Sequence, residues 1–246
     1  ARWPRELTQQ AILSQVPWLV GTTTWTEVRF GDGRLVPEKR FNSAALLDPD
    51  GSLHRVDKIF LTPFGETMPY VRAWPWLEQK VLDVGASGMS FNLDAAEEPA
   101  ILDLQTTHAG DWSIAVPICF EDAVPSVTRK LCVSEGTTVV DLIINISNDG
   151  WFGDSDAGRA SHAVSAAFRA IELGRPLLRV ANTGESALVL PDGRMPAVLP
   201  VRESANLFVK VPRYEGTTFQ ARWGNWLPRL MLLIAVTIGV FSVRVD

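Results

Sequence analysis

Cys119 is the residue whose type and setting most directly suggest chemistry. It ends the apolar run WSIAVPIC, and the acidic residues Glu121 and Asp122 follow it closely. A thiol in this setting is either an inert core side chain or a nucleophile held at the end of a strand. A nucleophilic cysteine also needs a proton acceptor and hydrogen-bond donors for an oxyanion, so its partners must come from elsewhere in the chain.

Lys58 is the other partner candidate, although a lone lysine in a strand is usually solvated at its tip. It lies in the run RVDKIFLTPFGETMPY, and Glu66 follows eight positions later. An ammonium beside the thiol would stabilise a thiolate by Coulomb attraction, most strongly in a dry pocket. The histidines His54, His108 and His162 have no context typical of a catalytic base, and each is expected to be a surface or turn residue.

The elements that must position these residues alternate between strands and helices. Helices are expected over 5–15 and 161–174, strands over 17–25, 111–119, 137–147 and 176–184, and hairpins at the turns within 29–36, 41–61 and 185–200. The run 137–147 is nearly all apolar or β-branched, which is typical of a strand buried on both faces. Residues 71–104 read as a long excursion loop with a short helix. This order predicts an α/β layered sandwich around a mixed sheet.

Composition excludes several classes of function. The chain of 246 residues has a net charge of −5 and no basic stripe, so we expect no nucleic-acid partner. Its two cysteines, Cys119 and Cys132, give neither a disulfide framework nor zinc spacing. The histidines also lack ligand spacing, so no metal and no organic cofactor is expected.

The C-terminal residues differ from the rest of the chain. An uncharged run of 14 residues extends from Leu230 to Val243, with Trp223 and Trp226 before it. A bilayer span needs about 20 apolar residues, and tryptophans favour the membrane interface. We expect a transmembrane helix here, because no polar stripe interrupts the run. The alternative is a buried core helix.

Several short motifs occur in a fixed order along the chain: Lys58, PFGE, ICFE, and SNDGWFG followed by RAIELGRPLLRVANTG. Together they resemble the nitrilase superfamily of carbon–nitrogen hydrolases, and within it the apolipoprotein N-acyltransferases. The resemblance covers roughly residues 16–246. It implies an α/β fold, a nitrilase-like α-β-β-α sandwich incomplete at its N-terminus, over residues 1–222. A C-terminal transmembrane helix and its flank would occupy residues 223–246.

The resemblance also implies roles for particular residues. Cys119 matches the nucleophile that becomes a thioester, and Lys58 matches the lysine of the catalytic triad. The backbone N–H of Phe120 would be a second oxyanion donor. Glu66 and Glu121 match acidic positions that hold the lysine and tune protonation.

Other residues follow the strand 137–147 and the helix after it. The substrate pocket is expected to be bordered by Asn148, Trp151 and Phe152, with a packed turn as the alternative. Asp122 matches no family position and is expected to be a solvated residue at a helix start. Arg175 and Arg179 are expected to pair with carboxylates at the sheet end, with a phosphate ligand as the alternative, and Asn182 and Gly184 are expected to form a supporting turn.

The superfamily's general base is a glutamate in a WPE motif. The nearest match, RWPRE at residues 2–6, has Arg5 in the glutamate position. Because the family's motif stands further before the LVG strand than Pro4 does here, we expect the glutamate upstream of this chain. These 246 residues alone are then expected not to catalyse turnover of a substrate.

The reaction implied is transfer of a fatty acyl chain from a phospholipid, through a Cys119 thioester, to the α-amino group of the diacylglyceryl-cysteine of an apolipoprotein. The expected partners are the phospholipid, the apolipoprotein and a membrane, and the protein would be a monomer. The resemblance places it in a bacterial inner membrane with the catalytic domain on the periplasmic side. The alternatives are a soluble amidase of the same superfamily and a non-catalytic, membrane-anchored binding module.

Overall fold

The computed structural model describes residues 5–31, 34–63, 65–67, 93–106, 110–199, 201–202 and 204–243. Most of the excursion loop expected over 71–104 lies outside the described residues, and so does His108. The elements, in chain order, are α1 (Arg5–Ser14), β1 (Trp18–Gly31), β2 (Arg34–Leu47), β3 (Leu53–Asp57), β4 (Leu102–Leu104), β5 (Trp112–Ala115), the 3₁₀ helix η2 (Cys119–Ala123), α3 (Pro125–Cys132), β6 (Val133–Ser134), β7 (Thr137–Thr138), β8 (Leu142–Ser147), the 3₁₀ helix η3 (Asp149–Phe152), α4 (Asp156–Leu173), β9 (Leu177–Ala181), β10 (Ser186–Val189), β11 (Ala197–Leu199), α5 (Phe219–Trp223) and α6 (Trp226–Val243).

Two sheets form the body of the molecule. Strands β1, β2 and β3 make an antiparallel three-stranded sheet, and a six-stranded sheet has the order β11-β10-β9-β8-β5-β4. In the larger sheet β5, β8 and β9 run parallel, whereas the outer strands pair antiparallel. The expected mixed sheet and the three expected hairpins are therefore confirmed.

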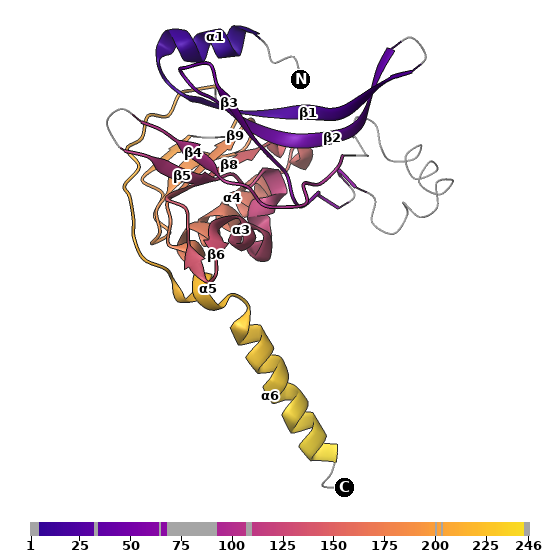
Figure 1. The fold of residues 1–246 in the computed structure, drawn as a ribbon. Coiled ribbons are helices and arrows are strands. Elements are labelled where there is room, and N and C mark those ends of the chain that lie inside the picture. Colours follow the sequence, from indigo (N-terminus) through magenta and orange to yellow (C-terminus); the bar gives the residue numbers. More distant parts are fainter. Residues whose placement is uncertain are drawn as a thin grey trace.

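The sheets face each other, and helices cover their outer faces (Figure 1). Helix α1 lies against the three-stranded sheet, and α3 and α4 lie against the six-stranded sheet. At the inter-sheet layer a Cβ on Gly21 would lie 3.0 Å from Ile146 Cγ2, so any larger residue in β1 would force the Ile146 side chain of β8 to shift. The core between the sheets includes Ala44, Leu46, Val56, Ile114, Ile118 and Leu142. The layers are those of an α-β-β-α sandwich.

Several expected elements have different limits, since the strands expected over 17–25, 111–119 and 176–184 are observed as β1, β5 and β9, and two further cases have a clear cause. Helix α4 begins at Asp156 rather than residue 161, because the Ser155 hydroxyl accepts the Gly158 N–H and caps it. Its end at Gly174, which adopts a left-handed conformation with φ 65°, is as expected. The run 137–147 is divided, since Thr137 and Thr138 pair with β6 and only β8 joins the large sheet.

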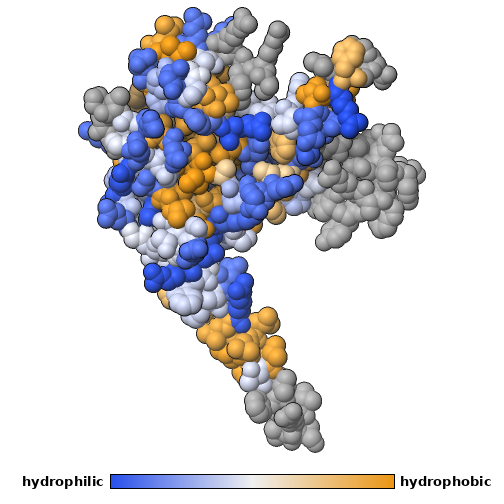
Figure 2. Space-filling model, viewed as in Figure 1, coloured by the Kyte–Doolittle hydropathy of each residue, from blue (hydrophilic) through white to orange (hydrophobic). Residues whose placement is uncertain are grey.

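Helix α6 extends away from the body (Figure 1), and apolar side chains cover much of it (Figure 2). Its residues 227–238 are exposed, so the alternative of a buried core helix is wrong. In the part of the chain that the structure describes, no helix combines the length and the apolar character needed to cross a membrane.

Candidate active site

Cys119 lies at a sharp turn between the large sheet and a helix. Strand β5 continues as extended chain to Ile118, which bridges to Ile146 of β8, and η2 begins at Cys119 itself. The backbone φ of Cys119 is +52°, a left-handed conformation that costs a non-glycine residue about 1–2 kcal/mol. The thiol is free and only partly buried, so the turn presents it at the edge of the sheet.

Cys132 contrasts with Cys119. It is a free thiol, fully buried in the core between the large sheet and its helices. Burial raises the pKa of the Cys132 thiol, which keeps it protonated. Cys132 is therefore a core residue.

Lys58 follows β3 and is completely buried, with its charge balanced inside the protein. Its Nζ lies 2.6 Å from Glu66 Oε2 and donates to Thr62 Oγ1 at 3.1 Å. Glu66 also accepts from Asn42 Nδ2 at 2.9 Å and from the Thr62 N–H at 2.8 Å. Burial raises the pKa of Glu66, but the Lys58 ammonium and these donors outweigh it, so the pKa is lowered. Glu66 is therefore an ionised carboxylate at neutral pH.

Glu121 joins the Lys58 segment to the Cys119 segment. Its Oε1 accepts the N–H groups of Ile59 and Phe60 at 2.8 and 2.9 Å, and its Oε2 accepts the Ile118 N–H at 2.7 Å. These groups directly follow Lys58 and directly precede Cys119. Glu121 therefore binds the backbone N–H groups beside Lys58, whereas Glu66 contacts the Lys58 ammonium. Burial raises the pKa of Glu121, partly opposed by the three N–H donors.

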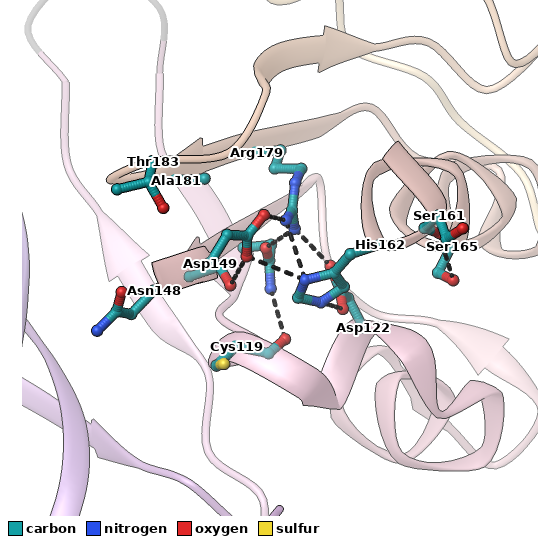
Figure 3. Close-up of polar contacts among 12 residues, drawn as sticks. Cys119, Asp122, Asn148, Asp149, Ser161, His162, Ser165, Arg179, Ala181 and Thr183 are labelled. Carbon is teal, nitrogen blue, oxygen red and sulfur yellow. Dashed lines mark hydrogen bonds and ion pairs between the residues drawn. The ribbon is translucent and has the colours of Figure 1, made fainter. Parts of the chain in front are cut away.

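Behind this turn lies a buried cluster of charged groups (Figure 3). Arg179 Nη1 donates to Asp122 Oδ2 at 3.0 Å, and its Nη2 donates to Asp149 Oδ2 at 2.6 Å. His162 lies between the same carboxylates, with Nε2 2.7 Å from Asp122 Oδ1 and Nδ1 3.0 Å from Asp149 Oδ1. All four residues are buried. We call Asp122, Asp149, His162 and Arg179 the charge quartet.

The charge quartet corrects two expectations and confirms one. Asp122 is not a solvated helix-start residue, because it is fully buried and pairs with two cations. His162 is not a surface or turn residue, because α4 buries it between the two aspartates. Arg179 does pair with carboxylates, as expected. Arg175 differs from the expectation, because its guanidinium donates to the backbone carbonyl oxygens of Val140, Gly174 and Gly216.

Protonation balances the charges of the quartet. Burial lowers the pKa of His162, but hydrogen bonds to Asp122 and Asp149 outweigh it and raise the pKa to about 9. Burial raises the pKa of Asp149, but His162 and Arg179 outweigh it, and the pKa is well below the usual range. Near neutral pH His162 therefore carries its proton and Asp149 is ionised, and this pairing of opposite charges makes their burial tolerable.

The segment 148–152, expected to border a substrate pocket, lies beside both the Lys58–Glu66 pair and the charge quartet. A Cβ on Gly65 would approach the Trp151 indole to 3.3 Å, which places the half-exposed Trp151 next to the Glu66 backbone. Phe152 packs edge-on against His162 at a centroid distance of 5.7 Å. Asn148 is exposed and accepts from Asn182 Nδ2 at 2.7 Å.

The turn at Asn182 and Gly184 supports the quartet. Asn182 Oδ1 accepts the Asp149 N–H at 3.1 Å. A Cβ on Gly184 would lie 2.0 Å from Asp149 Oδ2, so glycine is required for the carboxylate to reach Arg179. Across the described ranges, no group of three or more acidic, histidine or cysteine side chains has the arrangement of a metal site.

The α-β-β-α layers and the sharp turn at Cys119 are those of a known class of proteins. A family model of the carbon–nitrogen hydrolases matches residues 13–216, and the chain belongs to this family. Among curated proteins, "Apolipoprotein N-acyltransferase 2" of Treponema denticola is 33% identical over 215 residues, covering 87% of this chain and 39% of that protein. The "Apolipoprotein N-acyltransferase" of Haemophilus ducreyi is 34% identical over 210 residues, covering 83% and 39%. These matches confirm the resemblance found in the sequence.

The chain spans about two fifths of the length of these curated relatives. Solved structures with the same fold include an amidase from Nesterenkonia sp., with a TM-score of 0.54, 17% identity, and coverage of 80% of this chain and 62% of the amidase. At that identity the likeness concerns the nitrilase-like α/β fold alone.

Proposed function

We propose that the protein is an N-acyltransferase of bacterial lipoprotein maturation. It would transfer a fatty acyl chain from a phospholipid to the α-amino group of a diacylglyceryl-cysteine at an apolipoprotein N-terminus. The observation that carries this proposal is the Glu121 carboxylate, which ties the backbone beside the buried Lys58–Glu66 pair to the backbone beside Cys119. The names of the curated relatives supply the substrate class.

The residues take distinct roles in two half-reactions. The Cys119 thiolate attacks the ester carbonyl carbon, an S–C bond forms, and the lysophospholipid alkoxide leaves with a proton. The α-amine then attacks the thioester carbon, an amide forms, and the thiol is released. The Lys58 ammonium and the Phe120 N–H stabilise the oxyanion of each tetrahedral intermediate, and Glu66 holds the ammonium in place.

Proton transfer needs a general base. That base takes the proton of the Cys119 thiol and returns it to the departing alkoxide. The family resemblance gives this role to a glutamate upstream of these residues, and we expect the 246-residue chain alone not to turn over. Trp151 and Phe152, with Asn148 at the start of η3, would border the acyl pocket.

A lipid substrate agrees with the exposed apolar helix α6. Residues 1–222 would form the catalytic domain, and residues 223–246 would attach it to the bacterial inner membrane from the periplasmic side. Phe219 packs edge-on against Trp226 at 5.1 Å, and Trp223 is exposed beside them. Such an aromatic group at the start of an apolar helix suits the interface between water and lipid.

The test is formation of an acyl-enzyme. The protein, expressed from its complete gene, is incubated in detergent with a phospholipid donor and examined by intact-mass spectrometry. We expect an adduct of fatty-acyl mass that hydroxylamine releases. Cys119→Ser and Cys119→Ala should abolish it, whereas the matched control Cys132→Ala should retain it.

Two results would contradict the proposal. One is a folded protein without any adduct, and the other is an adduct that persists in both Cys119 variants. Release of ammonia from short amides, with no adduct from phospholipid, would instead support the amidase alternative.

A further inference from the structure

The left-handed backbone at Cys119 must be held by its surroundings. A non-glycine residue keeps such a conformation only where neighbouring structure fixes it. The carbonyl oxygen of Cys119 accepts a hydrogen bond from Asn145 Nδ2 at 3.1 Å. In Figure 3 this carbonyl points toward the charge quartet, and the sulfur lies on the other side of the residue. Asn145 therefore contacts the turn on the side that faces the charge quartet.

Asn145 holds the chain on both sides of Ile118. The same Nδ2 donates to the Pro117 carbonyl at 3.0 Å. Both protons of the amide are thus used on the two carbonyls that flank the last extended residue. Asn145 is fully buried in β8, at the centre of the large sheet, which makes it a rigid support.

Arg179 fixes which way the Asn145 amide faces. Arg179 Nη1 donates to Asn145 Oδ1 at 2.7 Å. A flipped amide would place its NH₂ against the guanidinium and its oxygen against two carbonyls, so only one orientation satisfies every group. Arg179 is in turn held by Asp122 and Asp149. Asp122 lies in η2, three residues after Cys119, so the quartet fixes the turn at two points.

The held carbonyl also determines the direction of an N–H group. In a planar trans peptide the C=O and the N–H point in opposite directions. Because the Cys119 carbonyl points to Asn145, the Phe120 N–H of the same peptide points away from it. We propose that Asn145, oriented by Arg179, is a positioning residue that aims the Phe120 N–H and holds Cys119 for acyl transfer. This inference rests on the proposed function for the role of Cys119 as nucleophile.

The peptide in question can be observed alone. Cys119 is followed by Phe120 and Cys132 by Val133, so Cys119–Phe120 is the single Cys–Phe bond in the sequence. The full chain, labelled with ¹³C at cysteine carbonyls and ¹⁵N at phenylalanine, should give one cross-peak in an HNCO spectrum. That peak reports both the Cys119 carbonyl and the Phe120 N–H.

The variant Asn145→Asp keeps the shape of the side chain but turns its two donors into an oxygen facing two carbonyls. Asn145→Ala removes the contacts without that repulsion and serves if the first variant does not fold. The matched control is Thr138→Val on β7, which removes a buried hydrogen bond to the Leu173 carbonyl and contacts neither Asn145 nor the charge quartet. Each variant is also measured for acyl-enzyme formation in the protein from the complete gene.

For either Asn145 variant we expect the cross-peak to move and the acylation rate to fall about 100-fold, the usual effect of a small misplacement of reacting groups. The donor concentration for half-maximal rate should stay the same, because the donor's binding surface is intact. Thr138→Val should leave both the peak and the rate near those of the parent protein.

The inference is overturned if a folded Asn145 variant keeps the parent's cross-peak and rate. It is equally overturned if Thr138→Val lowers the rate as much as the Asn145 variants do, since the effect would then be one of general stability. A parent protein that forms no adduct would refute the proposed function instead, and the cross-peak would still decide whether Asn145 holds the turn.

Discussion

Lys58 illustrates how one buried residue can serve both stability and chemistry. Its ammonium has no access to solvent, and Glu66 supplies the opposite charge at 2.6 Å. A buried ion pair of this kind contributes little net stability, yet loss of one partner leaves an uncompensated charge. The two roles can therefore be separated by changing one partner or both.

Lys58→Met is expected to abolish acyl-enzyme formation and to lower the free energy of unfolding by about 3–5 kcal/mol, because Glu66 stays buried without its cation. The double variant Lys58→Met/Glu66→Gln should recover most of that stability and none of the acylation. Urea unfolding and intact-mass spectrometry measure the two effects. Acylation that returns with stability in the double variant would show that Lys58 is structural only.

At the scale of elements, α4 brings His162 to the two aspartates of the quartet. The raised pKa of about 9, against an ordinary 6.5, means that the folded state binds the histidine proton more tightly than the unfolded state. That stabilisation is complete below pH 6.5 and is lost as pH rises through about 9. Arg179 alone then faces Asp122 and Asp149.

We therefore expect the free energy of unfolding to fall by roughly 3 kcal/mol between pH 6.5 and just above pH 9. Urea unfolding at a series of pH values measures this slope. His162→Gln is the control, since it cannot bind the proton, and its slope over the same range should be much smaller. Equal slopes in the parent and the variant would mean that His162 does not carry the effect.

The elements that the sequence predicted are those with local signals. The hairpins follow from Asp-Gly and Pro-Asp-Gly turns, and the end of α4 follows from Gly174. The quartet was missed because Asp122 and His162 are polar residues whose burial depends on partners in β9 and η3. One signal for the burial of His162 was available in the sequence. The buried face of α4 consists of residues that recur every three or four positions, namely Arg159, His162, Ala166, Arg169 and Leu173.

The site was predicted in part for the same reason. The resemblance marked Cys119, Lys58 and Glu66 through their motifs, and the structure adds the Lys58–Glu66 contact. Asn145 carries no local signal, because it lies within an apolar strand and acts on carbonyls 26 and 28 positions earlier. Side chains that act on the backbone of a distant turn are found from the fold and not from spacing.

At the scale of the whole molecule, the exposed apolar side chains of α6 need an environment. Leu233 and Ile234 are 62% and 49% exposed in the middle of the helix, and Figure 2 shows apolar side chains along it. A helix that exposes apolar side chains outside the body of a protein marks a contact with lipid or with another protein. The proposed lipid substrate favours lipid, and this can be tested with the 246-residue chain alone.

Replacing Leu233 and Ile234 together by lysine places two charges in the middle of α6. Because burying a charge in an apolar environment costs free energy, the double variant should lose the co-sedimentation with phosphatidylcholine vesicles that the parent chain shows. The matched control is Val164→Lys, an exposed apolar position on α4, which should co-sediment like the parent. Equal co-sedimentation of the double variant and the parent would exclude α6 as the membrane contact. A parent chain that remains in the supernatant would exclude it as well, because the exposed apolar face would then have no affinity for lipid.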